Sequence, residues 1–224
     1  MTGVDIMRVT KAIREQQIAI LRDVYRGTKP ALNFRNPFEL LIAVILSAQC
    51  TDKRVNVTTA RLFQKAATPE AILALGLTGL EEEIRDCGLY HSKAKHILAA
   101  CQMLCENYGG EVPADFKELQ KLPGVGRKTA NVVMSVAFHA PAIAVDTHVF
   151  RVANRLKLAV GKTPLDVELG LQKAIPKEDW SDAHHWLIWH GRKVCKARKP
   201  LCGSCPLNGV CPSADMPSEG KDTK

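Results

Sequence analysis

Two stretches of the chain combine residue types and spacings that could do chemistry. The first, LQKLPGVGRKTANVV at residues 119–133, places Lys128 directly after a turn that contains a proline and two glycines. The second carries four cysteines in the pattern C-x6-C-x2-C-x5-C, at Cys195, Cys202, Cys205 and Cys211. A lysine amine can act as a nucleophile, and four thiolates can hold a metal centre. Both kinds of site need surrounding elements that fix these groups in space.

Two helices joined by a tight turn are predicted around Lys128. Apolar residues recur at helical spacing on both sides of the turn. Pro123 lacks a backbone donor and disfavours a helix at the residue before it, while Gly124 and Gly126 can both take positive φ at little cost. A glycine-rich turn that opens a helix presents backbone N–H groups and the positive end of the helix dipole, which suits a phosphate. The candidate contacts to such an anion are Gly124, Val125, Gly126 and Arg127.

Two other structures have similar sequences, a nucleotide-binding P-loop and a plain helix–turn–helix connector. The run Gly126-Arg127-Lys128-Thr129 is similar to the end of a nucleotide-binding P-loop. However, Arg127 separates the glycine from the lysine, and Lys121 stands where a P-loop has its first glycine, so the P-loop is disfavoured. A plain helix–turn–helix connector with a surface lysine stays open on these residues alone.

The same hairpin, followed by the loop FHAPAIAV and by Asp146 in AVDTHVFRVANRL, resembles the helix-hairpin-helix (HhH-GPD) DNA glycosylase superfamily. The match is close to the endonuclease III branch and extends from about Asn33 to Cys211. The resemblance implies that Lys128 is the catalytic nucleophile. It also implies that Asp146 stabilises positive charge developing on the sugar, or relays the proton of the lysine.

A bifunctional DNA glycosylase and AP lyase of base excision repair is the function that this resemblance implies. Such an enzyme removes oxidised pyrimidines from duplex DNA through a lysine Schiff base and cleaves the strand by β-elimination. One alternative is a monofunctional adenine-excising relative, which typically lacks this lysine. The other is a non-catalytic DNA-binding module, which explains the hairpin but leaves Lys128, Asp146 and Gln49 without a role.

The local sequence adds physical reasons for both catalytic candidates. Asp146 directly precedes a predicted helix over 147–158, so it should occupy the N-cap, where N–H donors and the helix dipole favour a carboxylate. Lys128 falls in the first turn of its own predicted helix, where the dipole disfavours an ammonium and favours the neutral amine.

Three further residues are candidates for contact with the base stack. The resemblance implies that Gln49, in the SAQ stretch, fills the space left by an extruded nucleotide, and that Leu89 and Tyr90 act as wedges. Simpler interpretations remain. Gln49 follows a predicted buried helix and could satisfy its last carbonyl groups, and Leu89 and Tyr90, on a predicted loop, could be core contacts.

The cysteine spacing by itself leaves zinc and iron–sulfur nearly even, because only Cys202 and Cys205 form a close pair. The resemblance implies a [4Fe–4S] cluster held by all four residues of the pattern. Such a centre would pin the loop 196–201 between two ligands. Its cations, candidate phosphate contacts, are Lys196, Arg198 and Lys199.

Composition sets the wider limits. The 224 residues carry a net charge of +8, which favours a polyanionic partner. No apolar run reaches the length of a membrane span, the N-terminus does not read as a signal peptide, and the remaining four cysteines are scattered, which argues against a secreted disulfide framework. We expect a cytoplasmic, bacterial-type monomer that acts on damaged double-stranded DNA, without a membrane.

The predicted fold is all-α and two-lobed, with DNA in the cleft between the lobes. A helical-barrel lobe with the hairpin would span 30–140, a discontinuous iron–sulfur lobe 1–29 and 141–212, and a disordered tail 213–224. Periodicity and start signals predict the other helices at 4–25, 37–47, 53–66, 70–75, 80–86, 93–108, 165–175 and 180–190.

Overall fold

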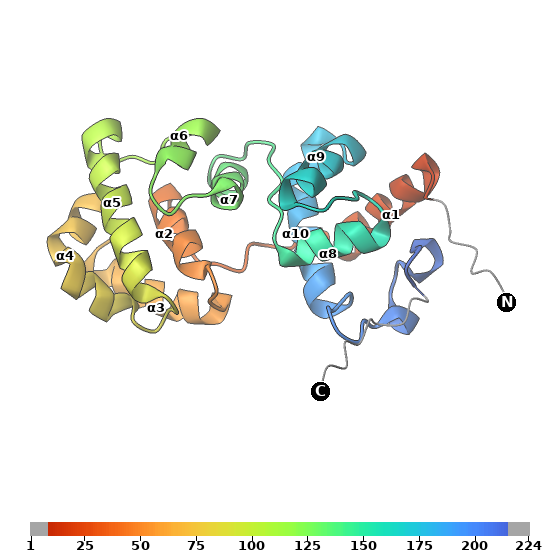
Figure 1. Ribbon diagram of the computed structural model, residues 1–224, viewed down its shortest axis with the longest axis horizontal. Helices are drawn as coiled ribbons and strands as arrows, with labels where there is room; N and C mark the ends of the chain where they lie inside the picture. The colour runs from red at the N-terminus through yellow and green to blue at the C-terminus, as the bar shows by residue number, and fades with distance from the viewer. Residues whose placement is uncertain (1–8, 215–224) are drawn as a thin grey trace. The chain divides into compact units, whose positions relative to one another are not determined.

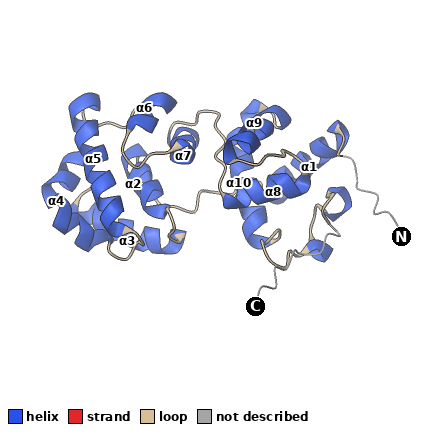
Figure 2. Ribbon diagram, viewed as in Figure 1, coloured by secondary structure: helices blue, strands red, loops and turns tan. Residues whose placement is uncertain are grey.

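The computed structural model describes residues 9–214, and every regular element in this range is a helix (Figures 1 and 2). The prediction of an all-α chain is therefore confirmed. None of the helices in the described range is both long and apolar enough to cross a membrane.

The chain divides into two compact units. One, which we call the hairpin unit, is Pro30–Ala142. The other, the cysteine unit, is discontinuous and joins the described residues up to Lys29 with those from Ile143 onward. Each unit has its own hydrophobic core.

The hairpin unit is built around one buried helix. Its helices are α2 (Pro37–Ser47), α3 (Asp52–Lys65), α4 (Pro69–Ile84), α5 (Tyr90–Tyr108), α6 (Phe116–Lys121) and α7 (Arg127–Ala137). Every residue of α2 from Phe38 to Leu46 is buried, and this helix packs against α3, α5 and α7. The Asn36 side chain accepts a hydrogen bond from Glu39 N, and Pro37 needs no donor in the first turn, so α2 begins where the sequence predicted.

Two helices of this unit differ from the prediction. Instead of separate helices over 70–75 and 80–86, α4 is one element with a kink at Gly76, whose φ is 63°. Instead of starting at Lys93, α5 starts at Tyr90, because Leu89 takes a left-handed conformation as its N-cap. Tyr90 therefore lies on a helix, and the predicted loop position was wrong.

The cysteine unit brings the N-terminal helix against the C-terminal part of the chain. Its helices are α1 (Lys11–Val24), α8 (Thr147–Leu156), α9 (Pro164–Ala174) and α10 (Trp180–Lys193), with 3-10 turns η1 (Lys177–Asp179), η2 (Cys202–Ser204) and η3 (Asn208–Val210). Helix α10 packs against both α1 and α8. The fully buried Gln17 on α1 donates hydrogen bonds to Leu156 O and Val210 O, at 3.0 and 2.8 Å, and so ties α1 to two distant segments.

Both ends of the described chain differ from expectation. Helix α1 begins at Lys11 with the Thr10 side chain as its cap, and residues 4–8 of the predicted helix lie outside the described residues. The tail was predicted to begin at 213, yet the Ser213 hydroxyl donates to Arg155 O at 2.8 Å and Ala214 N donates to Cys211 O at 3.2 Å. These two residues belong to the cysteine unit, and 215–224 lie outside the described residues.

Candidate active site and metal centre

The turn between α6 and α7 is anchored by apolar side chains and shaped by Gly124. Leu119, Leu122 and Val125 are buried. Gly124 has a φ of 80°, and a Cβ there would lie 2.9 Å from the Cβ of His96 on α5. Gly126 is different, because its φ is −83° and the space around it is open. The expectation of positive φ is right for Gly124 and wrong for Gly126, which serves as an extended N-cap.

The start of α7 lacks a side-chain cap. In the hairpin unit, side chains of Asn36, Thr51, Thr68 and Asp115 cap α2, α3, α4 and α6. Neither Gly126 at α7 nor Leu89 at α5 provides such a hydrogen bond. The first N–H groups of a helix have no partner within the helix. The two helix starts without a side-chain cap in this unit are therefore those that carry predicted DNA contacts.

Arg127 and Lys128 project from the first turn of α7. Both are exposed, and the Arg127 guanidinium lies 5.1 Å from the centroid of the Phe116 ring on α6. Lys121, at the end of α6, pairs with Glu118 at 2.7 Å. By contrast, among the described residues the Lys128 amine takes part in no hydrogen bond or ion pair. This amine is accessible and uncommitted, as a nucleophile must be.

Gln49 and Leu89 lie on adjoining loops and share an unusual backbone conformation. Their φ angles are 52° and 60°, and a Cβ at Gly88 would lie 3.6 Å from Gln49 O. Gln49 is exposed, and 58% of Leu89 is exposed. Left-handed angles at residues other than glycine cost free energy, and such residues cluster at functional sites. The geometry therefore agrees with a wedge role for both, which stays a prediction.

Tyr90 is placed differently from Leu89. As the first residue of α5 it is half-buried against the core, and its ring lies 4.0 Å from that of His91, centroid to centroid. Tyr90 thus contacts the core, as the simpler interpretation expected. A contact of Tyr90 with DNA stays a prediction.

Asp146 is the N-cap of α8, as predicted. Its Oδ1 accepts hydrogen bonds from His148 N and Val149 N, both at 2.8 Å. Both bonds end on the same oxygen, so Oδ2 takes no part in the cap. Asp146 lies in the cysteine unit and Lys128 in the hairpin unit, so the predicted approach of the two side chains stays a prediction.

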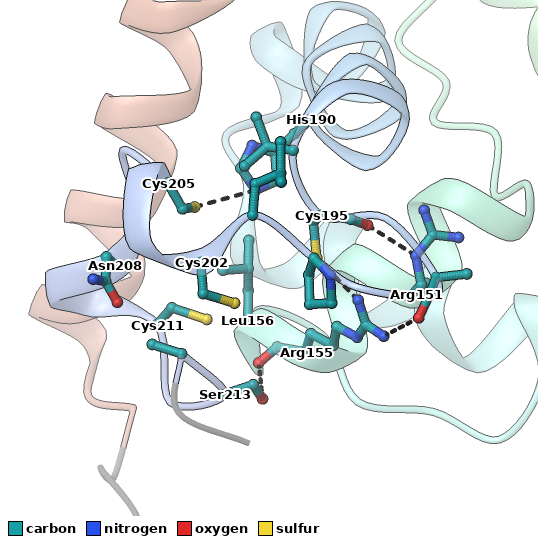
Figure 3. A pocket seen from close by; sticks show the side chains of 15 residues that line it. Arg151, Arg155, Leu156, His190, Cys195, Cys202, Cys205, Asn208, Cys211 and Ser213 are labelled. Atoms are coloured by element: carbon teal, nitrogen blue, oxygen red, sulfur yellow. Dashed lines mark hydrogen bonds between the residues drawn. The ribbon is translucent and has the colours of Figure 1, made fainter. Parts of the chain in front are cut away.

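The four cysteines of the pattern line one cavity of about 440 Å³ in the cysteine unit (Figure 3). Within residues 9–214, no three His, Cys, Asp or Glu side chains lie close enough together to hold a single metal ion. The thiols are instead spread around a hollow, which fits a cluster with a body of its own. Burial raises the pKa of the Cys211 thiol to about 11, so at neutral pH the free thiol is protonated and releases its proton to solvent only when it binds a metal centre.

Two N–H donors and one imidazole nitrogen lie close to the cysteine sulfurs. Leu207 N donates to Cys205 Sγ at 3.4 Å, and Arg155 Nη1 donates to Cys195 Sγ at 3.5 Å. His190 Nε2 lies 3.8 Å from Cys205 Sγ (Figure 3). Burial lowers the pKa of His190 to about 4. Hydrogen bonds to sulfur are a standard feature of protein-bound iron–sulfur clusters, so these residues fit the predicted cofactor.

Two arginines on α8 hold the cysteine segment, and sequence reasoning missed both. Arg151 donates to Cys195 O at 3.0 Å and to Gly191 O at 2.9 Å. Arg155 donates to the carbonyl groups of Lys196 and Ala197, at 2.7 and 2.9 Å. Their spacing of four residues on one helix face was the available signal.

The basic loop 196–201 is fixed at its base and exposed at its tip. Leu201 N donates to Val194 O at 3.0 Å and closes the loop. The exposed cations are Lys196, Arg198 and Lys199, the last with a φ of 48°. A loop held in this way presents its charges at little entropic cost.

Two protein-family models match this chain. The model of the HhH-GPD superfamily of base excision DNA repair proteins matches residues 42–177, and that of the iron–sulfur binding domain of endonuclease III matches 195–211. Endonuclease III of Escherichia coli (strain K12) is 52% identical over 203 residues, which cover 91% of this chain and 96% of the relative. Endonuclease III of Bacillus subtilis (strain 168) is 55% identical over 84% of this chain and 87% of the relative.

Solved structures agree with these matches. A trapped endonuclease III–DNA covalent intermediate has a TM-score of 0.89 at 52% identity and covers 92% of this chain and 98% of that one. A thermostable thymine-DNA glycosylase has a TM-score of 0.81 at 27% identity, over 91% of this chain and 97% of that one. Fold and site thus define the class, the HhH-GPD base excision DNA repair proteins. Within it, the chain belongs to the endonuclease III family, and the prediction of a [4Fe–4S] cluster is confirmed.

Proposed function

We propose that this chain removes oxidised pyrimidines from duplex DNA and then cleaves the strand, as a DNA glycosylase and AP lyase of base excision repair, with Lys128 as its nucleophile. One observation carries the assignment of Lys128. It is an exposed and uncommitted amine in the first turn of a helix that has no side-chain cap. A related endonuclease III has been trapped in a covalent intermediate with DNA, and such an intermediate needs a nucleophile on the protein.

DNA binding is assigned to the hairpin and to the basic loop. The open space at Gly126 lets a phosphate approach the first N–H groups of α7, and the Arg127 guanidinium, stacked on Phe116, adds a fixed positive charge. When bound, the [4Fe–4S] cluster would be held by the four cysteines of the pattern and would close the cysteine segment, so that Lys196, Arg198 and Lys199 contact further phosphates. These contacts position the duplex without reading its sequence.

Access to the sugar requires that the damaged nucleotide leave the stack. Extrusion costs a few kcal/mol and is easiest for a damaged or poorly paired base. Gln49 and Leu89 are exposed on adjoining loops and are assigned to fill the gap that remains. Filling this gap restores contacts to the neighbouring base pairs and lengthens the life of the extruded state.

The chemistry begins with attack of the Lys128 amine at the sugar C1′. The new C–N bond replaces the bond to the base, which leaves with a proton, and the sugar opens to an iminium bound to Lys128. The iminium makes the C2′ proton acidic. Loss of that proton forms a C1′–C2′–C3′ conjugated system and expels the 3′-phosphate, which cleaves the strand. Hydrolysis of the iminium restores the amine.

Asp146 is assigned the electrostatic role. Its Oδ1 is held by two backbone N–H groups, which fixes the carboxylate, and Oδ2 is left outside this cap. A fixed negative charge stabilises the positive charge that develops on the sugar as the base departs. The approach of Asp146 and Lys128 to one sugar is part of this proposal, as are a monomeric acting form and a place in the bacterial cytoplasm on the nucleoid.

Borohydride trapping on duplex DNA that carries an oxidised pyrimidine tests the nucleophile. Borohydride reduces an iminium to a permanent cross-link, so the wild-type protein should give a covalent adduct and Lys128→Ala none, with turnover lower by a factor on the order of 10³. Lys121→Ala is the matched control, because it removes a lysine from the other helix of the same hairpin. That variant should form the adduct normally.

Other outcomes would redirect the assignment. An adduct that persists in Lys128→Ala would move the nucleophile to another amine. Binding without any adduct, on damaged or abasic DNA, would point to a monofunctional glycosylase or to a binding module.

A further inference from the structure

A line of contacts runs from the N-terminal helix to one cysteine of the cluster. Tyr25, the C-cap of α1, is 5% exposed, and its hydroxyl lies 3.0 Å from His190 Nδ1. His190 is on the last turn of α10 and is 1% exposed. Its other ring nitrogen, Nε2, faces Cys205 Sγ at 3.8 Å (Figure 3). Two buried side chains thus connect α1 with a ligand of the metal centre.

The direction of each hydrogen bond follows from the cysteine end. A thiolate bound to iron carries no proton, so Cys205 Sγ can only accept. Nε2 donates to this sulfur when it carries the hydrogen, and in a neutral imidazole that tautomer leaves Nδ1 as the acceptor. The Tyr25 hydroxyl then donates to Nδ1. Burial raises the pKa of Tyr25 to about 12, so its hydroxyl keeps the proton it donates.

The His190 backbone also contacts one cysteine of the pattern. Cys195 N donates to His190 O at 2.8 Å, so one residue contacts two of the four cysteines. This bond fixes the backbone at the end of α10, and the His190 ring itself is buried. The tautomer of the ring then depends on the hydrogen bonds that its two nitrogens make.

We propose that Tyr25 and His190 are positioning residues for the [4Fe–4S] cluster, in which Tyr25 fixes the His190 tautomer so that Nε2–H donates to Cys205 and raises the reduction potential of the cluster. An added electron increases the negative charge on the sulfurs, so a donor to sulfur stabilises the reduced cluster more than the oxidised one. Without the Tyr25 hydroxyl, Nδ1 can carry the hydrogen and Nε2 turns a lone pair toward the sulfur. This inference goes beyond the proposed function, because it does not depend on Lys128.

The test compares Tyr25→Phe with Tyr108→Phe in the cluster-bound protein. Both changes remove one hydroxyl, and the Tyr108 hydroxyl donates to Glu118, within the hairpin unit. The measurement is the midpoint potential of the cluster, from a dye-mediated redox titration followed by the electron paramagnetic resonance signal of the reduced form. We expect a more negative potential for Tyr25→Phe, with a several-fold lower ratio of reduced to oxidised cluster at a fixed potential, and no shift for Tyr108→Phe.

A second pair of variants separates the hydrogen bond from packing. His190→Gln keeps an amide N–H donor and should recover part of the potential that His190→Leu loses. An unchanged or more positive potential in Tyr25→Phe overturns the proposal, as does an equal shift in Tyr108→Phe. If the His190 variants fail to retain the cluster, Tyr25→Phe decides alone. Borohydride trapping of Tyr25→Phe should be normal, so failure of this inference is distinguishable from failure of the Lys128 assignment.

Discussion

The hairpin turn at 122–126 and the cysteine segment at 195–211 both lie beside a helix end and contain or adjoin exposed cations, but they are held in different ways. Leu122 and Val125 of the turn are buried, and Gly124 packs closely against His96. In the cysteine segment, all of which is described, Leu207 is the one buried side chain. Its order comes from two 3-10 turns, from Arg151 and Arg155, and from the four cysteines.

This contrast separates two ways of holding charged side chains in place. The hairpin takes its shape from the hydrophobic core and is formed as soon as that core is formed. The cysteine segment buries too little apolar surface to order itself and depends on its cofactor, as small metal-binding segments do. Loss of the cofactor should therefore affect one region and spare the other.

The largest effect is expected when a cluster ligand is removed. Cys202→Ala should abolish cluster retention and release the segment, so amide hydrogen exchange over 195–211 should accelerate by about 10²-fold or more. The hairpin amides should keep their protection. Cys105→Ala, which alters a half-buried cysteine of the hairpin unit, is the control and should leave the cluster in place. Equal loss of protection in the hairpin would show that the two regions are not independent.

Asp146 in the cysteine unit and Asp115 in the hairpin unit both cap a helix, and comparing their variants tests whether the Asp146 carboxylate takes part in base excision. In both residues Oδ1 accepts hydrogen bonds from two backbone N–H groups. Asparagine caps helices about as well as aspartate. Asp146→Asn should therefore leave stability nearly unchanged but lower base excision by about 10²-fold, because the fixed negative charge is gone. Asp115→Asn should change neither quantity much. Single-turnover excision and thermal unfolding measure the two effects, and equal activity in both variants would remove Asp146 from the mechanism.

The two hairpin glycines should respond differently to alanine. Gly124→Ala forces a Cβ into a left-handed backbone and against His96, and should lower the free energy of unfolding by about 2 kcal/mol. Gly126→Ala meets open space and an ordinary φ, so its stability should fall by less than about 1 kcal/mol while its DNA affinity drops. Denaturant unfolding and titration with duplex DNA give both numbers. Equal destabilisation by the two changes would contradict the distinct roles.

The smallest effect concerns strained residues. Gln49, in the hairpin unit, and Lys157, the C-cap of α8 in the cysteine unit, have φ angles of 52° and 54°. Glycine at either position relieves strain and should stabilise the protein by about 0.5 kcal/mol. Only Gln49→Gly should also reduce excision, because only Gln49 is assigned to the base stack. Unimpaired excision by Gln49→Gly would support the simpler interpretation of Gln49 as a helix-end residue.

Local signals predicted much of the fold. Helix α2 was predicted with its observed bounds because Pro37 marks its start and a largely apolar run follows. Asp146 was predicted as an N-cap on the same kind of signal. The start of α5 was missed, because a leucine in the left-handed region has no signature in sequence and is imposed by the surrounding structure.

The site was predictable to the extent that its residues are neighbours in the chain. The cysteine pattern and the hairpin glycines each lie within one short stretch, and the resemblance then gave their roles. Tyr25 and His190 were missed because they contact each other across 165 residues of sequence. Which distant groups meet is decided by how helices pack, and no periodicity in a single stretch encodes it.

The discontinuity of the cysteine unit has a consequence for the order in which the protein takes shape during synthesis. Helix α1 leaves the ribosome before the hairpin unit, yet two of its contacts, Gln17 with Val210 and Tyr25 with His190, can form only after the hairpin unit has been made. The hairpin unit is continuous and can fold while the rest of the chain is still being made. A nascent chain therefore acquires its lysine-bearing hairpin before its four cysteines are available to bind iron, and α1 gains its contacts with α10 only after α10 has been made.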